Sequence, residues 1–159
     1  MATEYLQNGN FIDKLKHWAQ GPKPFDPKFE PYGSGNSIYV PIHSILQQSF
    51  PELRAGLAMQ VEFDACSVED DVNDAYFIVS VGGITSEGVW QASPIPGSAT
   101  SQWQSYSARI VFPLTLTQCF LLVAAPEPAV IKGKKTAAMA PELTSMRFAN
   151  FWLFEQGVS

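Results

Sequence analysis

Few side chains in this 159-residue chain are of the kinds that catalyse reactions. The two histidines, His17 and His43, lie in no nucleophile or metal-ligand motif. Glu69, Asp70 and Asp71 form an acidic run, but adjacent acids in a turn usually make a solvated tip, not a paired acid and base. We therefore expect that the protein is not an enzyme.

The two cysteines, Cys66 and Cys119, lie inside predicted strands. Two isolated thiols cannot complete a zinc site, and they do not indicate a disulfide framework. Free cysteine is among the most buried residue types, so we expect both thiols to be free and buried. No residue pattern indicates a cofactor.

The composition disfavours several classes of partner. The net charge of −5 and the isoelectric point of about 4.9 make phosphate backbones and anionic membranes poor partners. No apolar stretch approaches the ~20 residues of a transmembrane helix, and the N-terminus lacks the basic and apolar regions of a signal peptide. We expect synthesis in the cytoplasm, no membrane insertion and no nucleic-acid partner.

The elements that must position any site are strands. Residues 57–65, 75–81 and 102–112 alternate between two faces, and a period of two indicates a strand with one buried face. Residues 118–124 are apolar on both faces, which indicates a central strand. Further strands are expected at residues 4–7, 37–41, 43–50, 89–92 and 144–154. About ten strands at this spacing, with no helical period, indicate an all-β sandwich in one domain over residues 1–159.

Two loop insertions and the closing strand suggest assembly. Residues 21–36 hold four prolines, which exclude a helix or a central strand, together with three aromatic residues. Residues 126–141 form a polar, alanine-rich insertion, and the closing strand is apolar on both faces. With 16% charged residues, this pattern predicts an oligomer or part of a larger assembly. The expected interface residues are Phe25, Phe29, Tyr32, Phe151 and Leu153.

Residues 6–18 carry the most informative motif. They predict a short strand, a tight turn at Asn8-Gly9, where Asn-Gly tolerates positive φ, and an apolar return to the core. Phe11, Leu15 and Trp18 are the expected anchors of this turn in the core. The run resembles the motif N-G-N-F-x-D-G-L-x-x-W of jelly-roll carbohydrate-binding modules and galactose-binding-like domains. The matching positions are Asn8, Gly9, Asn10, Phe11, Asp13, Leu15 and Trp18, while Lys14 stands where the family has glycine. The resemblance implies a jelly-roll β-sandwich of two antiparallel sheets.

Other stretches extend the resemblance over nearly the whole chain, although each motif is degenerate. Residues 45–48 resemble the strand that reads "sisQ", and residues 59–65 resemble "Y-x-L-S-F-x-A". Residues 103–107 resemble "W-x-x-Y-S", and residues 146–153 resemble the closing "F-D-N-V-S-L". Together these motifs support the fold.

The resemblance also implies a structural calcium ion, which modules of this family often hold. Calcium needs six to eight oxygen ligands, usually with two or more carboxylates. Here Ala149 replaces the aspartate of the closing strand, Ile12 stands where glutamate is common, and Asp13 is the one candidate carboxylate. We expect calcium to be absent or dispensable.

Sugar binding is the second implication of the resemblance. Modules of this architecture stack pyranose rings on aromatic side chains and hold the hydroxyls with amides and carboxylates. The candidate residues in this chain are Trp90, Tyr76, Gln60, Glu62 and Arg109.

Two functions from different classes are compatible with these features. The first is a non-catalytic, carbohydrate-binding-module-like protein that acts in surface recognition or adhesion and is displayed on a larger particle. The second is a structural component of a phage virion, such as a capsid decoration, baseplate or tail-fibre protein, whose jelly roll serves assembly. Synthesis in the cytoplasm followed by incorporation into a virion fits either function.

Overall fold

The structure, a computed structural model, describes residues 4–21, 24–41, 44–68, 75–124 and 145–155. Its strands are β1 (Ala19–Gln20), β2 (Phe29–Tyr32), β3 (Gly35–Val40), β4 (Ile45–Leu53), β5 (Ala58–Ser67), β6 (Ala75–Thr85), β7 (Trp90–Ala99), β8 (Gln104–Val111), β9 (Leu116–Ala124) and β10 (Met146–Glu155). His43, the acidic run and the insertion at 126–141 lie outside the described residues. Within the described ranges, no helix has the length and apolar character needed to cross a membrane.

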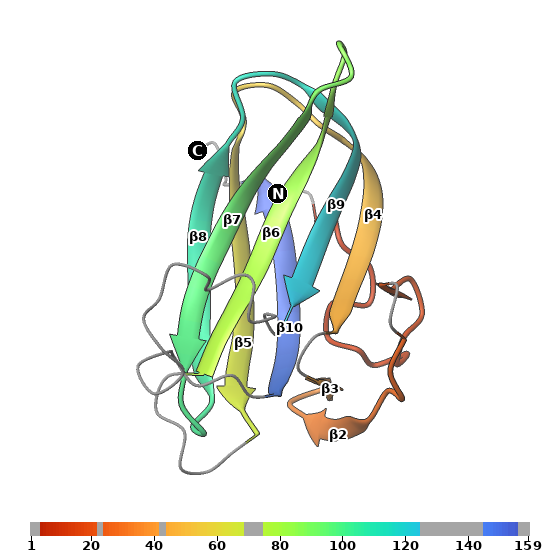
Figure 1. Ribbon diagram of the computed structural model, residues 1–159, viewed down its shortest axis with the longest axis vertical. Coiled ribbons are helices and arrows are strands. Elements are labelled where there is room, and N and C mark those ends of the chain that lie inside the picture. Colours follow the sequence, from red (N-terminus) through yellow and green to blue (C-terminus); the bar gives the residue numbers. More distant parts are fainter. Residues whose placement is uncertain (1–3, 22–23, 42–43, 69–74, 125–144, 156–159) are drawn as a thin grey trace, which may run out of the picture.

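The strands form two antiparallel five-stranded sheets that pack face to face (Figure 1). The front sheet has the order β1-β4-β9-β6-β7, and the rear sheet has the order β2-β3-β10-β5-β8. The predicted all-β jelly-roll sandwich is therefore confirmed, and β9 is central, as its two apolar faces predicted.

The core lies between the sheets and follows the predicted alternation. The side chains of Met59, Val61 and Phe63 on β5 are at most 1% exposed, and those of Phe77 and Val79 on β6 are fully buried. The Phe63 and Phe77 rings meet edge to face at 5.7 Å between centroids and so join the two sheets.

A β-bulge changes the faces of the closing strand β10. Its register against β5 shifts between Ala149 and Trp152, and Asn150 has a φ of +53°. An extra residue in one strand reverses the alternation beyond it. As a result Phe151 and Leu153 are 1% and 0% exposed, while Trp152 is 49% exposed. The prediction that Phe151 and Leu153 form an interface is wrong, because both lie in the core of their own chain.

Several strand boundaries differ from the sequence predictions. Residues 4–7 form an isolated bridge from Glu4 to Phe154 instead of a strand. β6 continues through Gly82 and Gly83 instead of ending there, and β7 extends well past the predicted 89–92. The prolines of β7 and β2 are tolerated because both are edge strands, where a missing N–H leaves no partner unsatisfied.

The N-terminal clasp, residues 6–18, is organised by Asn8. This residue adopts a φ of +55°, and its side-chain oxygen accepts a hydrogen bond from the Asp13 amide at 2.9 Å. The Asn8 amide group donates to the Lys14 and Lys16 carbonyls, and its own carbonyl accepts from the Trp18 indole at 2.9 Å. Asn8, not Gly9, therefore supplies the left-handed conformation that the turn needs.

Gly9 has a different role, which is to allow close approach to β10. A Cβ on Gly9 would lie 2.0 Å from the Phe151 carbonyl oxygen, and the Phe151 amide donates to the Gly9 carbonyl at 2.9 Å. Phe11 and Trp18 are 0% and 7% exposed and pack against the Phe151 ring, which confirms them as core anchors. The clasp thus holds the β10 bulge in place.

The three aromatic residues of the proline-rich segment also contact their own chain. Phe25 and Phe29 pack against the core, and Phe29 lies 6.4 Å from the Phe11 ring. Tyr32 packs on Trp103 at 4.3 Å between centroids. The three aromatic side chains that suggested a subunit interface therefore pack within their own chain. Cys66 and Cys119 are free and buried, as predicted.

Candidate functional site

The predicted sugar-binding residues lie on opposite faces of the molecule and do not form one site. Trp90 and Tyr76 belong to β7 and β6 of the front sheet, whereas Gln60, Glu62 and Arg109 belong to β5 and β8 of the rear sheet. On the rear sheet, the Gln60 amide donates to the Glu62 carboxylate at 2.7 Å, and Arg109 lies opposite Gln60 in the ladder. The core separates this group from Trp90.

Tyr76 and Trp90 share the outer face of the front sheet but are far apart along it. Trp90 pairs with Ile84, whereas Tyr76 pairs with Ser98, eight positions further along β7. At ~3.4 Å per residue this separation is on the order of 27 Å. Tyr76 therefore lies outside any compact site that contains Trp90.

Trp90 forms one wall of a hollow of about 430 Å³ on the outer face of the front sheet, the Trp90 hollow. The hollow is lined by Gln47, Ser49, Trp90, Gln118 and Phe120. Trp90 is 61% exposed, and its ring centroid lies 5.8 Å from that of half-buried Phe120. Two aromatic rings and two side-chain amides thus meet at one place.

Glycines in β6 allow the two rings to meet. Trp90 on β7 and Phe120 on β9 are separated by β6, and each strand spacing is about 4.8 Å. Gly82 pairs with both Phe120 and Ala92, so no side chain stands between the rings at this position. The ladder between β6 and β9 is also irregular from Gly82 to Ile84.

Gln118 reaches the hollow through a backbone irregularity in β9. It has a φ of +48°, which is unfavourable for a residue with a side chain. Against β6, Phe120 pairs with Gly82 and Thr117 pairs with Ile84, so β9 has one extra residue here and Gln118 lies at the bulge. Strained backbone of this kind often occurs at functional sites, where a bulge re-aims a side chain.

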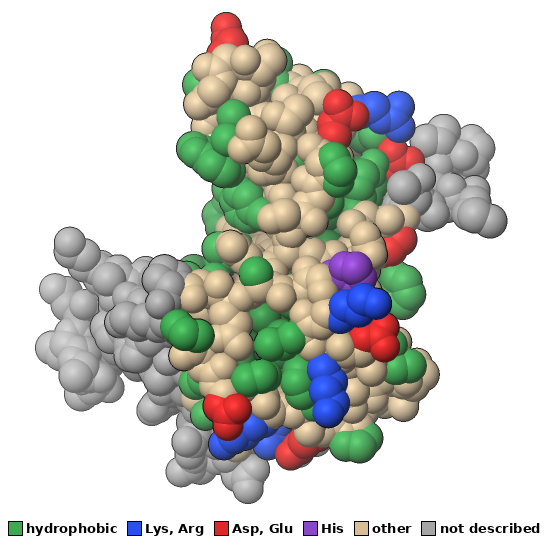
Figure 2. All heavy atoms as spheres, turned by 90° about the vertical axis from the view of Figure 1, so that its right-hand side faces the viewer, with side chains coloured by type: hydrophobic (Ala, Val, Ile, Leu, Met, Phe, Trp, Pro, Cys, Tyr) green, Lys and Arg blue, Asp and Glu red, His purple; other side chains and the backbone are tan. Residues whose placement is uncertain are grey.

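The outer face around the hollow carries no charge over most of its length. The outward-facing residues are Ile45, Gln47 and Ser49 on β4, Phe120, Leu122 and Ala124 on β9, Tyr76, Ile78, Ser80 and Gly82 on β6, and Trp90, Ala92, Pro94, Pro96 and Ser98 on β7. In Figure 2 this face is seen edge-on along the upper left, where green and tan side chains lie below an acidic tip. The arrangement suits an uncharged ligand with apolar faces and hydroxyl groups.

Sequence reasoning identified Trp90 but missed the four residues that line the hollow with it. Gln47, Ser49, Gln118 and Phe120 come from β4 and β9, which are adjacent to each other only in the folded sheet. One signal was present, because Gly82-Gly83 inside an apolar run can mark a bulge as well as a strand end.

The described residues offer little for a metal ion. Asp13 is exposed, and within the described ranges no three His, Cys, Asp or Glu side chains come together. A calcium site with several carboxylate ligands has no candidate there. The weak calcium candidate Asp13 stays a prediction.

Comparison with protein-family models and with curated proteins finds no match. Solved structures do match. The C-terminal family 22 carbohydrate-binding module of Clostridium thermocellum Xyn10B aligns at a TM-score of 0.65 and 13% identity, over 98% of this chain and 96% of that one. TmCBM61, solved in complex with β-1,4-galactotriose, aligns at 0.55 and 11%, over 97% and 99%.

The chain has the fold of carbohydrate-binding modules. The enzymatically active domain of bacteriophage CBA120 tailspike protein 4 also aligns, at a TM-score of 0.59 and 12% identity, over 94% of this chain but 21% of that one. At these identities the similarity shows the fold alone, so ligands must be argued from the side chains of this chain.

Proposed function

We propose that the protein binds a neutral carbohydrate, without catalysis, at the Trp90 hollow. The observation that carries this proposal is the exposed Trp90 ring beside Phe120, over a hollow whose lining has no charged residue. The C–H face of a pyranose ring is apolar and stacks on the negative face of an aromatic ring. Packing of the core does not require an exposed tryptophan on the outer face of a sheet.

The polar side chains around Trp90 complete the expected chemistry. The amides of Gln47 and Gln118 can each donate and accept hydrogen bonds, and the Ser49 hydroxyl can do both. Sugar hydroxyls need partners of this dual kind. A ligand with a carboxylate or sulfate group finds no counter-charge in the hollow, which favours neutral oligosaccharides.

The similar structures support the same class of ligand. TmCBM61 was solved with a bound galactotriose, and the Xyn10B module was studied for ligand binding in its cleft. The aligned parts span nearly the whole of this chain and of both modules. A shared fold allows a shared mode of recognition, and the Trp90 hollow supplies the side chains for it.

The module is also proposed to serve surface recognition or adhesion as part of a larger particle. The phage tailspike domain that aligns with this chain favours a place in a larger particle. The aligned part is 21% of the tailspike chain, so in that protein the similar unit belongs to a longer chain. The alternative is a virion component whose jelly roll serves assembly alone. Oligosaccharide binding distinguishes the two functions, since recognition or adhesion requires it and assembly alone does not.

An oligosaccharide array followed by calorimetry tests the proposal. We expect binding to neutral oligosaccharides that falls by roughly tenfold or more in Trp90→Ala and is partly restored in Trp90→Phe. Tyr76→Ala, which removes an aromatic ring elsewhere on the same face, is the matched control and should bind normally. An array without any neutral ligand, or full affinity in Trp90→Ala, would refute the proposal and favour assembly.

A further inference from the structure

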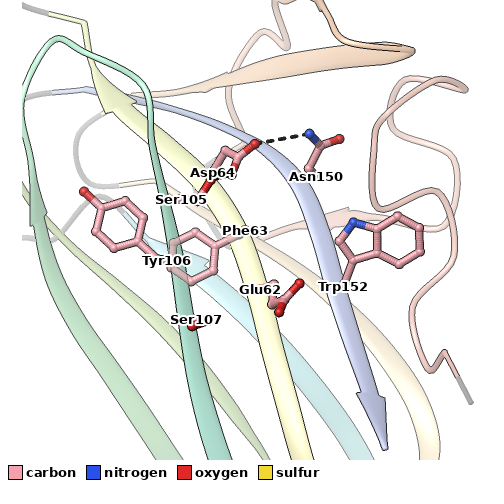
Figure 3. Close-up of a pocket in the computed structure, with 8 residues that line it drawn as sticks. All are labelled: Glu62, Phe63, Asp64, Ser105, Tyr106, Ser107, Asn150 and Trp152. Atoms are coloured by element: carbon pink, nitrogen blue, oxygen red, sulfur yellow. Dashed lines mark hydrogen bonds between the residues drawn. The ribbon is translucent and has the colours of Figure 1, made fainter. Parts of the chain in front are cut away.

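A second hollow, of about 330 Å³, lies on the outer face of the rear sheet, opposite the Trp90 hollow. Its lining differs from that of the Trp90 hollow, because it contains two carboxylates, Glu62 and Asp64. Figure 3 shows these side chains together with Ser105, Ser107, Asn150 and Trp152 on the three neighbouring strands β8, β5 and β10. We call this group the Trp152 hollow.

The polar side chains form two rows across the three strands. In the first row, Asn150, Asp64 and Ser105 are joined by hydrogen bonds to the Asp64 carboxylate, at 3.2 Å from the Asn150 amide and 2.7 Å from the Ser105 hydroxyl. The Tyr32 hydroxyl also donates to Asp64, at 2.9 Å. Burial and the neighbouring Asp64 carboxylate raise the pKa of Tyr32 to about 12, so this donor stays protonated. The first row is therefore a fixed structural support.

The second row is open to a ligand. Trp152 and Ser107 are the direct cross-strand partners of Glu62, on either side of it. Side chains at such positions have Cβ atoms about 5 Å apart. One Glu62 oxygen accepts from Gln60, and within the described residues neither its second oxygen, nor the Trp152 indole, nor the Ser107 hydroxyl has a hydrogen-bond partner.

The fold creates this exposure through the β10 bulge. Residues 151 and 153 point into the core, so Trp152 between them must point outward, beside Glu62. The Gly9 carbonyl holds the bulge through the Phe151 amide. The position of the exposed tryptophan is thus fixed by a backbone contact from the clasp, residues 6–18.

We propose that the Trp152 hollow binds a sugar unit that carries a protonated amino group, such as a glucosamine residue of an oligosaccharide. The pyranose ring stacks on Trp152, and the ammonium group lies between the Glu62 carboxylate and the face of the indole ring. A cation beside both a carboxylate and an aromatic ring gains from both attractions. The hydroxyls of the sugar face Ser107 and Ser105. This site is independent of the Trp90 hollow and takes a different class of sugar.

Titration calorimetry with a β-1,4-linked glucosamine hexamer, at a pH where its amines are protonated, tests the proposal. We expect binding that weakens by roughly tenfold in Trp152→Ala and in Glu62→Gln, and that is partly retained in Trp152→Phe. Glu87→Gln removes the same charge from the distant β6–β7 turn and controls for general attraction of a cation to an acidic protein. The N-acetylated hexamer, which is uncharged, should bind the parent protein far more weakly.

Equal affinities for Glu62→Gln and Glu87→Gln would overturn the proposal, because they would show attraction to net charge alone. Equal binding of both hexamers would also overturn it. Trp90→Ala separates this site from the proposed function. If that variant loses neutral ligands but keeps the glucosamine hexamer, the two sites are distinct; if it loses the glucosamine hexamer, the ligand binds at the front sheet and the Trp152 assignment is wrong.

Discussion

Burial determines the chemistry of the two thiols at the residue scale. Cys66 and Cys119 are 3% and 1% exposed, and desolvation of the charged form raises the pKa of each from its ordinary value of 9.0 to about 11. The thiolate is the reactive form of cysteine, so both residues are held in their inert state near neutral pH. Both thiols are free and buried, so their role is in packing.

This environment predicts slow alkylation of the native protein. With iodoacetamide at pH 8.5 we expect no modification of folded protein by mass spectrometry, and modification of both thiols after unfolding in urea. The linked effect on stability has a fixed sign. Between about pH 9 and pH 11 the unfolded thiols lose protons that the folded thiols keep, so the free energy of unfolding falls as pH rises. Equal alkylation rates for folded and unfolded protein would contradict this account.

The four tryptophans show how one residue type takes several roles in one chain. Trp18 is 7% exposed in the clasp, and Trp103 is half-buried against Tyr32. Trp90 and Trp152 are 61% and 49% exposed on opposite sheets. Sequence alone placed Trp18 in the core and selected Trp90 as a ligand candidate. It did not select Trp152, because the bulge that turns it outward involves Asn150 and no glycine.

At the element scale, the clasp connects the N-terminal motif to the closing strand. The Gln48 side chain, 4% exposed on β4, accepts from the Gln7 amide at 2.6 Å and donates to the Gln7 carbonyl at 2.8 Å. The Gly9 backbone then joins the bulge of β10. The clasp is therefore bonded to both sheets, and it closes the end of the sandwich where the Phe11, Trp18 and Phe151 rings meet.

Gly9→Ala should disrupt this connection. The added methyl group would lie 2.0 Å from a backbone oxygen, which cannot rotate away as a side chain can. We expect a loss of at least about 1–3 kcal/mol in the free energy of unfolding, measured by urea denaturation. Gly33→Asn is the control, since the space around Gly33 is open and asparagine tolerates its φ of +58°. If Gly9→Ala had the same urea midpoint as the parent protein, the close contact between the clasp and β10 would be contradicted.

The sequence predicted the elements better than their irregularities. The alternation in residues 57–65 and 75–81 identified the inward side chains correctly, since one buried face imposes a period of two. The bulge at Asn150 and the bulge at Gln118, opposite Gly82-Gly83, were not predicted, because bulges depend on the partner strand and not on local propensity. The predicted sugar-binding residues were wrongly grouped into one site for a related reason. The topology decides which sheet a strand joins. The positions of Trp90 and Glu62 in the sequence therefore could not show that the two residues lie on opposite sheets.

At the scale of the whole molecule, the two outer faces differ in chemistry. The front sheet presents the Trp90 hollow, whose lining is uncharged, whereas the rear sheet presents Glu62, Asp64, Arg109 and the Arg147–Glu30 ion pair at 3.2 Å. A sandwich with one site on each face can hold two saccharides at once, and two weak sites on one molecule gain avidity on a surface that carries both ligands.

Whole-molecule assembly has less support from the structure than from the sequence. Phe151 and Leu153 are core residues, and Phe25, Phe29 and Tyr32 pack on their own chain. The large apolar side chains that remain exposed in the described ranges are Ile12, Val89, Trp90, Val111, Leu114 and Trp152. Two of these are the proposed sugar platforms, so ligand binding accounts for them without a neighbouring subunit.

The most direct test of the central claim is a nuclear magnetic resonance titration of ¹⁵N-labelled protein with β-1,4-galactotriose and other neutral oligosaccharides that bind on the array. The four indole N–H signals report on four separate environments in one spectrum. We predict that the Trp90 indole and the side-chain amides of Gln47 and Gln118 shift with ligand concentration, while the Trp18 and Trp103 indoles do not. Saturable shifts centred on any other part of the molecule, with the Trp90 signal unchanged, would contradict the assignment of the Trp90 hollow as the neutral-carbohydrate site.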